Sequence, residues 1–273
     1  MTIGGCEFRW GERTYVMGII NVTPDSFSGD GLGCDVEAAA RLAAHMREEG
    51  ADIIDVGGES TRPASAEVSA EEEMRRVLPV IERLALDLDI PISIDTYKAE
   101  VAKAANEAGV ALVNDVHGFL REPDIARVAA EAGVPAIAMY NHRGRVFHDT
   151  IGNIVQGLIE SLQVARQQGL PEDQIIVDPG FNFGWTDAQA LEMLRRLSEL
   201  RVLGRPILVG TSRKSTIGKV LGDLPVEERL EGTAATVAIA IANGADIVRV
   251  HDVKEMVRVA RITDAVVRGS RRA

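Results

Sequence analysis

Eight short apolar segments rich in β-branched residues recur along the chain, and segments with helical spacing separate them. The apolar segments are residues 16–21, 52–56, 91–94, 111–113, 135–139, 174–177, 206–209 and 246–250. Near-continuous apolar runs of this length are typical of strands that are buried on both faces, as in a parallel sheet. The sequence therefore predicts eight parallel strands.

The intervening segments are rich in Ala, Glu and Arg, and an eighth such segment follows the last strand. They are residues 35–49, 70–86, 98–108, 124–132, 151–168, 187–200, 226–242 and about 253–267. Several of them end just before a glycine, the residue that best adopts the left-handed conformation after a helix: Gly50, Gly109, Gly133, Gly169 and Gly244. Eight strand–helix units predict an α/β fold, a single (β/α)8 TIM barrel, with an open doubly wound sheet as the alternative. No linker-like stretch divides the chain, so we expect residues 1–273 to form one domain.

Charge and composition narrow the range of partners. The chain has 30 Lys and Arg against 41 Asp and Glu, a net charge of −11, which disfavours general binding to nucleic acid. Two cysteines suggest no disulfide framework and favour a cytoplasmic location. The amino terminus lacks the pattern of a signal peptide, and the longest apolar stretch, residues 234–242, is too short to span a membrane. We therefore expect small-molecule ligands.

Polar residues follow every predicted strand at its carboxyl end. They are Asn21, Asp55, Asp95, Asn114, Asn141 with His142, Asp178, residues 211–214, and Arg249 with His251. Barrel enzymes place their chemistry at these strand ends. A capping role explains any one of these residues. Polar residues at the carboxyl ends, or exits, of all eight strands instead predict a polar pocket at one mouth of the barrel.

The residue types at these exits indicate two kinds of ligand group. Asp95, Asn114 and Asp178 supply hydrogen-bond acceptors and one amide, which suits a planar heterocycle with an amino-pyrimidinone edge. Lys214, Arg249 and His251 form a cationic cluster, which suits an anionic group such as phosphate. Each cation alone is equally well explained by a surface salt bridge, but the three together favour an anion site.

Two longer stretches resemble signatures of the dihydropteroate synthase family. They are MGIINVTPDSFSGDG, residues 17–31, and ADIIDVGGESTRP, residues 51–63. The short motifs SIDT (93–96), VNDV (113–116), DPGF (178–181), GTSRKS (210–215) and RVHDV (249–253) follow in the order of that family. The resemblance extends from about residue 15 to the end of the chain.

The resemblance implies a reaction in folate biosynthesis. These barrel enzymes join 4-aminobenzoate to 6-hydroxymethyl-7,8-dihydropterin diphosphate, with Mg²⁺ as cofactor, and form 7,8-dihydropteroate and pyrophosphate. It also implies a homodimer, formed through helices at one side of the barrel, and an aminobenzoate pocket that accepts sulfonamides.

The family pattern also assigns roles to residues of this chain. It implies that Asp95, Asn114, Asp178 and Lys214 hold the pterin with Met139 packed along it, that Arg249 and His251 surround the diphosphate, and that Asn21 contacts Mg²⁺. Lys214, Arg249 and His251 are the implied catalytic groups. The residues implied at the aminobenzoate site are Thr61, Arg62, Pro63, Phe183 and Ser215.

The chain departs from the family pattern at two places. After the fifth strand the family usually has Met-His-Met with Gly, whereas this chain has MYNHRG at residues 139–144. After Asp-Pro-Gly the family usually has Gly-Phe-Gly-Lys, whereas Asn182 and Trp185 here replace the first Gly and the Lys. We expect these differences to alter the rim near the aminobenzoate pocket and to leave the pterin floor unchanged.

Two alternative functions are consistent with a pterin-binding barrel. One is a methyltransferase that uses methyltetrahydrofolate and a corrinoid partner, and the other is a non-catalytic pterin-binding paralogue. The long motifs and the Arg249–His251 pair favour the synthase over both.

Overall fold

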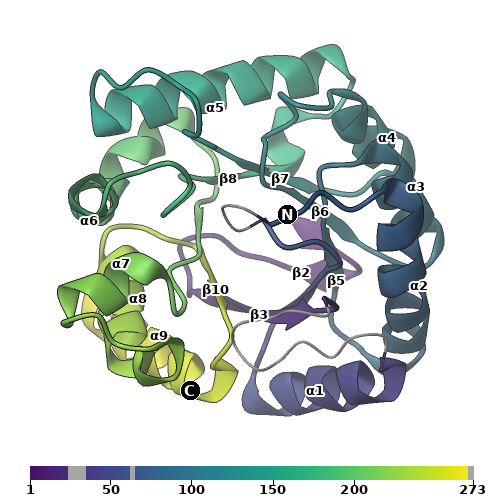
Figure 1. The fold of residues 1–273 in the computed structure, drawn as a ribbon, viewed down its shortest axis with the longest axis horizontal. Coiled ribbons are helices and arrows are strands. Elements are labelled where there is room, and N and C mark those ends of the chain that lie inside the picture. Colours follow the sequence, from purple (N-terminus) through teal and green to yellow (C-terminus); the bar gives the residue numbers. More distant parts are fainter. Residues whose placement is uncertain (24–34, 62–64, 270–273) are drawn as a thin grey trace.

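Eight parallel strands form a barrel at the centre of the molecule, and helices surround it (Figure 1). The computed structural model describes residues 1–23, 35–61 and 65–269. The barrel strands are β3 (Tyr15–Asn21), β4 (Ile53–Gly57), β5 (Ile92–Asp95), β6 (Leu112–Asp115), β7 (Ala136–Met139), β8 (Ile175–Asp178), β9 (Leu208–Val209) and β10 (Ile247–Val250).

Neighbouring strands pair in parallel in the order β8-β7-β6-β5-β4-β3-β10-β9. A parallel bridge between Val177 and Ile207 joins the two ends of this order, and the Val177 amide donates to the Pro206 carbonyl at 2.9 Å. The predicted barrel is therefore confirmed, and the open-sheet alternative is wrong. The assignment of residues 1–273 to one domain stays a prediction, because the description does not cover the whole chain.

Alternation along β3 explains how the barrel is filled. Tyr15 and Met17 belong to the apolar cluster inside the barrel, whereas Val16 and Ile20 belong to the cluster between strands and helices. Successive side chains of a strand point to opposite faces, so residues 15, 17, 19 and 21 share the inner face. The strand thus contributes apolar side chains to the core at its start and a polar one, Asn21, at its carboxyl end.

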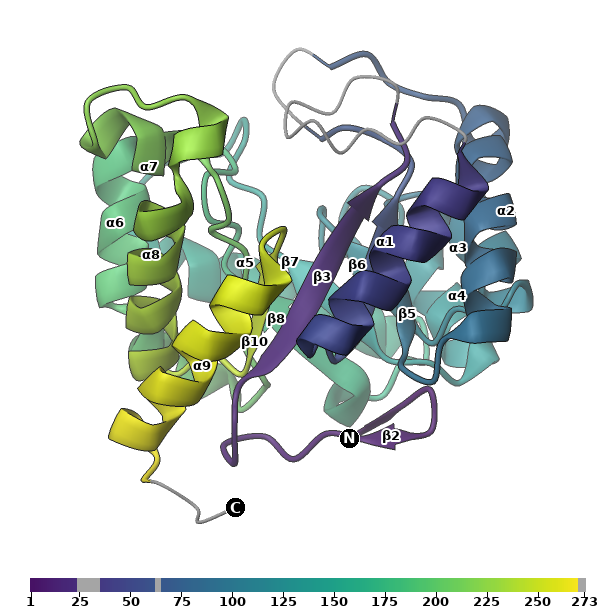
Figure 2. The same cartoon turned by 90° about the horizontal axis from the view of Figure 1, so that it is seen from below.

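A short antiparallel hairpin closes the amino-terminal end of the barrel (Figure 2). It consists of β1 (Thr2–Ile3) and β2 (Cys6–Glu7), which the sequence analysis did not predict. Ile3 and Phe8 are buried in the inner cluster, and Trp10 packs against it. The hairpin therefore adds apolar side chains to the core that fills the amino-terminal part of the barrel.

Helices follow the strands in turn and cover the outside of the barrel. They are α1 (Val36–Glu49), α2 (Ala70–Asp87), α3 (Ala99–Glu107), α4 (Asp124–Ala132), α5 (Thr150–Gln167), α6 (Asp187–Arg195), α7 (Ser215–Val220), α8 (Leu230–Ala242) and α9 (Val253–Val267). Gly50 and Gly133 end α1 and α4 with φ of 106° and 67°, as the sequence predicts for left-handed caps.

Two helical predictions differ from the structure in detail. The segment 187–200 is divided into α6 and a 3-10 helix, η2 (Leu197–Leu203), and the segment 226–242 into η3 (Val226–Glu228) and α8. The six-residue helix α7 was not predicted, because its sequence follows a strand as part of the polar GTSRKS motif. The tighter turns allow short connections at these points without changing the order of strands and helices.

Candidate active site

One cavity at the carboxyl ends of the strands brings together most of the residues predicted from the sequence. Its volume is about 70 Å³. The predicted residues that line it are Thr61, Asp95, Asn114, Met139, Asp178, Phe183, Lys214, Arg249 and His251, and Ile19, Val116, Gly210 and Ser212 complete the wall. Residues far apart in the sequence meet here because the strands that carry them are parallel and end at the same mouth.

Arg249 pairs with two carboxylates at the floor of this cavity. Its Nε donates to Asp55 Oδ2 at 2.6 Å, and its Nη2 donates to Asp95 Oδ2 at 2.7 Å. Asn114 Nδ2 also donates to Asp55 Oδ2, at 3.1 Å. Arg249 therefore neutralises the floor carboxylates as well as contributing positive charge to the cavity.

Asp55 is a site residue that the sequence analysis named only as a strand-end carboxylate. Its side chain is fully buried, and its Oδ1 has no hydrogen-bond partner among the described residues. A carboxyl two residues before the end of a barrel strand, on the inner face, is the pattern that would have identified it. Asp55 does not line the cavity, so its role is to hold Arg249 and Asn114 from behind the wall.

Burial perturbs the acid groups of the cavity. Burial raises the pKa of Asp95 to about 7, although Arg249 favours the carboxylate. Burial also raises the pKa of Asp178, and Lys214 opposes this shift. Asp178 Oδ1 accepts the amide of Gly180 at 2.7 Å. Asp95 can therefore exchange a proton near neutral pH, and perturbed carboxyls of this kind are typical of functional sites.

Lys214 lines the same cavity and immediately precedes α7. Burial lowers its pKa to about 8, and Asp178 opposes the shift. Its Nζ donates to the Phe181 carbonyl at 2.6 Å and lies 4.8 Å from the centre of the Phe183 ring. The ammonium group is therefore held between the Asp178 side of the cavity and the aromatic Phe183.

His251 is fixed by the neighbouring strand exit. Its Nδ1 is 3.0 Å from Ser212 Oγ, which also accepts the His251 amide at 3.2 Å. Arg213, between Ser212 and Lys214, pairs instead with Asp252 through Nε and Nη2 at 3.0 and 2.5 Å. Of the cationic side chains at this exit, Lys214 lines the cavity and Arg213 holds the two exit loops together.

The structure describes three of the five residues predicted for the aminobenzoate site, and all three lie in or beside the cavity. Thr61 and Phe183 line the cavity, and Ser215 lies beside it, where Asn182 Nδ2 contacts Ser215 Oγ at 2.9 Å. Arg62 and Pro63 lie outside the described residues. Asn182 has a φ of 68°, a left-handed conformation that explains why glycine suits this position and why asparagine is tolerated.

Asn21 lies at the carboxyl end of β3, on the same face as the cavity-lining Ile19. Its amide oxygen is a hard donor of the kind that Mg²⁺ accepts. In the described part of the chain, no three His, Cys, Asp or Glu side chains form a group able to hold a metal ion. A Mg²⁺ ion held through one protein oxygen and ligand phosphates fits this donor set, because Mg²⁺ usually keeps waters and phosphate oxygens as ligands.

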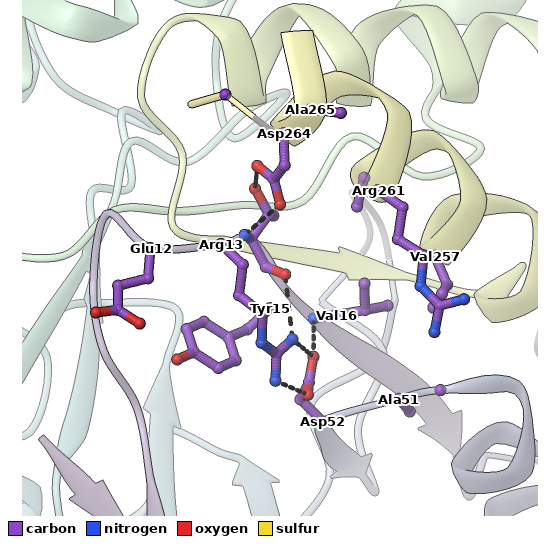
Figure 3. A pocket seen from close by; sticks show the side chains of 14 residues that line it. Glu12, Arg13, Tyr15, Val16, Ala51, Asp52, Val257, Arg261, Asp264 and Ala265 are labelled. Atoms are coloured by element: carbon purple, nitrogen blue, oxygen red, sulfur yellow. Dashed lines mark hydrogen bonds and ion pairs between the residues drawn. The ribbon is translucent and has the colours of Figure 1, made fainter. Parts of the chain in front are cut away.

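A larger cavity, of about 630 Å³, lies at the other end of β3 and contains none of the predicted site residues. Figure 3 shows Arg13 directed at Asp52, which it contacts at 3.0 and 2.6 Å. Asp264 of α9 accepts the amide and hydroxyl of Thr14 at 2.7 and 2.8 Å. These pairs connect the start of β3 to β4 and α9, which is the contribution to stability expected at the amino-terminal end of a barrel.

None of the helices within the described ranges combines the length and the apolar character needed to cross a membrane.

Comparison with known proteins agrees with the geometry of the cavity. A family described as pterin binding enzyme matches residues 17–251. A dihydropteroate synthase of Clostridium beijerinckii is 51% identical over 269 residues, covering 98% of this chain and all of the relative. One from Bacillus subtilis is 49% identical, covering 93% of this chain and 89% of the relative.

Solved structures give the same result. A dihydropteroate synthase from Clostridium difficile, crystallised in the presence of pteroic acid, superimposes with a TM-score of 0.91 at 49% identity. The superposition covers 96% of this chain and all of the Clostridium difficile chain. A Yersinia pestis synthase in complex with a sulfonamide drug has a TM-score of 0.93 at 39% identity, with 99% of each chain covered. The chain therefore belongs to the pterin-binding enzymes, among the dihydropteroate synthases.

Proposed function

We infer that this protein condenses 6-hydroxymethyl-7,8-dihydropterin diphosphate with 4-aminobenzoate, releasing pyrophosphate and forming 7,8-dihydropteroate for folate biosynthesis. The observation that carries this inference is that one cavity is lined both by Asp95, Asn114 and Asp178 and by Lys214 and Arg249. The acceptors suit the N–H groups of a pterin, and the cations suit a diphosphate.

The floor is proposed to hold the pterin. Asp95 and Asp178 accept ring N–H groups, and Asn114 can donate and accept with its amide. Met139, which is buried at the carboxyl end of β7, packs along the ring. Lys214 donates to a pterin acceptor from the opposite side.

The reaction breaks a C–O bond and forms a C–N bond at the methylene carbon attached to the pterin ring. The ring delocalises positive charge that develops at this carbon, and the diphosphate leaves with the electron pair of the C–O bond. Lys214, Arg249 and His251 stabilise the negative charge on the leaving group. The neutral arylamine attacks the carbon and loses one proton, so it needs orientation and exclusion of water more than a strong base.

We propose that Mg²⁺ assists this step, with Asn21 as its protein ligand. When bound, the ion supplies positive charge at the diphosphate. The amide oxygen of Asn21, on the inner face of β3 near the mouth, supports this assignment. Removal of divalent metal with a chelator should therefore lower turnover while binding of the free pterin alcohol is retained.

The second substrate is proposed to bind between Thr61, Phe183 and Ser215, with Arg62 and Pro63 completing the site. Phe183 presents an aromatic ring beside the Lys214 ammonium group, which suits an arylamine that carries a carboxylate. A sulfonamide has a similar size and charge distribution, so we expect it to compete with 4-aminobenzoate.

We further propose that the protein is a cytoplasmic homodimer. The support for the dimer is three exposed apolar side chains on neighbouring elements, Leu191 of α6, Val202 of η2 and Ile239 of α8, whose exposed fractions are 41%, 75% and 46%. Helices α6 and α8 are neighbours, and α8 has no charged residue after Glu231. In a two-fold dimer, the same surface of a second copy of this chain would cover these side chains.

A turnover assay tests the proposed reaction. The protein is incubated with both substrates and Mg²⁺, and dihydropteroate is measured by mass spectrometry while pyrophosphate is measured enzymatically. We expect the two products in equal amounts and neither product when one substrate is omitted. Methyl transfer from methyltetrahydrofolate without dihydropteroate formation would favour the methyltransferase, and pterin binding without turnover would favour the non-catalytic paralogue.

A further inference from the structure

The two segments in which this chain departs from the family pattern lie against each other. The loop after β7 and the loop after β8 are joined by the His142 amide, which donates to the Phe183 carbonyl at 2.9 Å. Gly184 has a φ of 88°, and a Cβ atom at this position would lie 2.6 Å from the Arg143 nitrogen. The backbones are therefore packed without room for a side chain, so a change in one loop moves the other.

An aromatic stack reinforces this contact. The rings of His142 and Trp185 are parallel within 3°, with their centres 4.0 Å apart. Tyr140 Oη lies 3.0 Å from His142 Nδ1, and all three side chains are buried. Trp185 does not line the cavity, so it influences the rim through His142 and not by direct contact. The two departures are thus parts of one structural unit.

Arg143 extends from this unit toward the cavity. Its Nη1 donates to the Thr61 carbonyl at 2.9 Å, and its guanidinium carbon lies 4.9 Å from the centre of the Phe183 ring. Thr61 and Phe183 both line the cavity but come from different strand exits, β4 and β8. Arg143 therefore connects the two walls between which the second substrate is proposed to bind.

We propose that Arg143, held by the His142–Trp185 stack, is a positioning residue that sets the distance between Thr61 and Phe183 and so determines affinity for the arylamine substrate. This inference rests on the proposed function, because it assigns those two walls to 4-aminobenzoate. Arg143 does not contact the proposed pterin floor, which is formed by Asp95, Asn114 and Asp178. Its replacement is therefore expected to separate the two substrates kinetically.

The test compares Arg143→Met, which removes the N–H donors, with Arg143→Gln, which keeps an N–H donor that can reach toward the Thr61 carbonyl. We expect Arg143→Met to raise KM for 4-aminobenzoate about 5- to 30-fold, the equivalent of about 1–2 kcal/mol for one lost hydrogen bond from a charged group. We expect kcat to change less than threefold and the calorimetric Kd of the pterin alcohol less than twofold. Arg143→Gln should recover part of the lost affinity.

Arg127→Met is the control, because Arg127 is an exposed arginine of α4 that pairs with Asp124 and Glu131 of the same helix, at 3.2 and 2.9 Å. The control removes the same charge and should leave KM for 4-aminobenzoate unchanged.

Trp185→Ala tests the stack. KM for 4-aminobenzoate should also rise in this variant. In the double variant Trp185→Ala with Arg143→Met, KM should be no higher than in the single variant that has the higher KM. Because Trp185→Ala is a large change in a buried site, thermal unfolding of each variant is measured, and the Met and Gln variants decide the question alone if Trp185→Ala does not fold.

Two results would overturn the inference. One is an Arg143→Met protein with an unchanged KM for 4-aminobenzoate, or with equal losses for both substrates, while the wild-type protein forms dihydropteroate. The other is an Arg127→Met protein that shows the same rise in KM, which would assign the effect to surface charge. A wild-type protein without turnover would be recognised separately, since it would overturn the proposed function itself and this inference with it.

Discussion

The protonation states of Asp95 and Lys214 determine how the cavity responds to pH. Burial raises the pKa of Asp95 to about 7 and lowers that of Lys214 to about 8 in the protein without ligand. Below about pH 7 a protonated Asp95 accepts a ligand N–H less well, and above about pH 8 a neutral Lys214 attracts a ligand acceptor less strongly. The cavity is therefore best prepared for a pterin between these two values.

We predict that pterin affinity is greatest between about pH 7 and 8 and declines on both sides. Above about pH 8 the decline approaches tenfold per pH unit, because binding must then return one proton to Lys214. Lys214→Arg should remove the alkaline decline, since a guanidinium remains protonated. The measurement is the calorimetric Kd of 6-hydroxymethyl-7,8-dihydropterin from pH 6 to 9.5. An identical alkaline decline in both proteins would show that another group titrates.

His251 and Arg249 should differ in which part of the substrate they affect. His251 is held at Ser212, away from the floor carboxylates, whereas Arg249 donates to both Asp55 and Asp95. We predict that His251→Ala weakens binding of the pterin diphosphate at least about fivefold, because one hydrogen bond is lost. The affinity for the pterin alcohol should change less than twofold. Arg249→Ala should weaken binding of both ligands, because it also removes the counter-ion of Asp55 and Asp95. Equal losses for the two ligands in His251→Ala would place His251 outside the diphosphate site.

At the scale of secondary-structure elements, a buried ion-pair cluster connects the exits of β4 and β5 to α2. Lys98 Nζ donates to Glu59 and to Glu73, and Tyr97 Oη donates to Glu59 at 2.9 Å. The Glu73 side chain is 1% exposed. This cluster fixes the backbone immediately before Thr61, so it supports one wall of the cavity from behind.

We predict that Lys98→Met destabilises the protein by about 3 kcal/mol at pH 8, because two buried carboxylates lose their counter-ion. Burial already raises the pKa of Glu73, so protonation of Glu73 favours the folded state and the deficit should become smaller as the pH falls toward 5. The free energy of unfolding in urea, measured at both pH values, checks this. Adding Glu73→Gln to Lys98→Met should recover stability at pH 8, and a deficit independent of pH and of Glu73 would contradict the assignment.

The longer elements were predictable from the sequence, whereas several short ones were not. Periodicity and the glycines after α1 and α4 define those helices, because the left-handed caps are local features. The hairpin strands β1 and β2 have only two residues each, and α7 has six, so neither carries a periodic signal. These short elements depend on packing against the barrel, and a local sequence pattern does not reveal such packing.

The site was predictable as a set of residues but not as a set of contacts. Asp95, Asn114, Asp178 and Arg249 were identified because parallel strands bring their carboxyl ends to one mouth. The pairing of Arg249 with Asp55, 194 positions away in the sequence, depends on which rotamers fit together in the closed barrel. The bond from Arg143 to Thr61 likewise depends on the path of two loops, which is set by tertiary packing.

At the scale of the whole molecule, the helices on one side of the barrel present the apolar surface proposed for dimerisation. Figure 1 shows α8 on the side of the barrel opposite α2. We predict that Ile239→Glu converts the dimer to a monomer at micromolar concentration, because a charge would be buried in the interface. Leu86→Glu, at an 84% exposed position on α2, is the control and should leave the dimer intact. Sedimentation velocity distinguishes the species, and a wild-type monomer, or a dimer that tolerates Ile239→Glu, would contradict this interface.

A cavity lies at each end of the barrel, and we assign the pterin to the smaller one. Asp178 lines the cavity at the carboxyl ends of the strands, and Asp264 lines the larger cavity at the other end. Replacing either aspartate by asparagine keeps the shape of the side chain but exchanges a carboxylate oxygen for an amide NH₂. In a pterin site this places a donor against the ring N–H groups.

The most direct measurement is the calorimetric Kd of 6-hydroxymethyl-7,8-dihydropterin for the wild-type protein, Asp178→Asn and Asp264→Asn. We predict that Asp178→Asn weakens binding at least about tenfold, the equivalent of about 1.4 kcal/mol for an unsatisfied buried contact, and that Asp264→Asn leaves binding unchanged. Unchanged binding in Asp178→Asn, or a loss confined to Asp264→Asn, would contradict the assignment of the pterin to the carboxyl-end cavity.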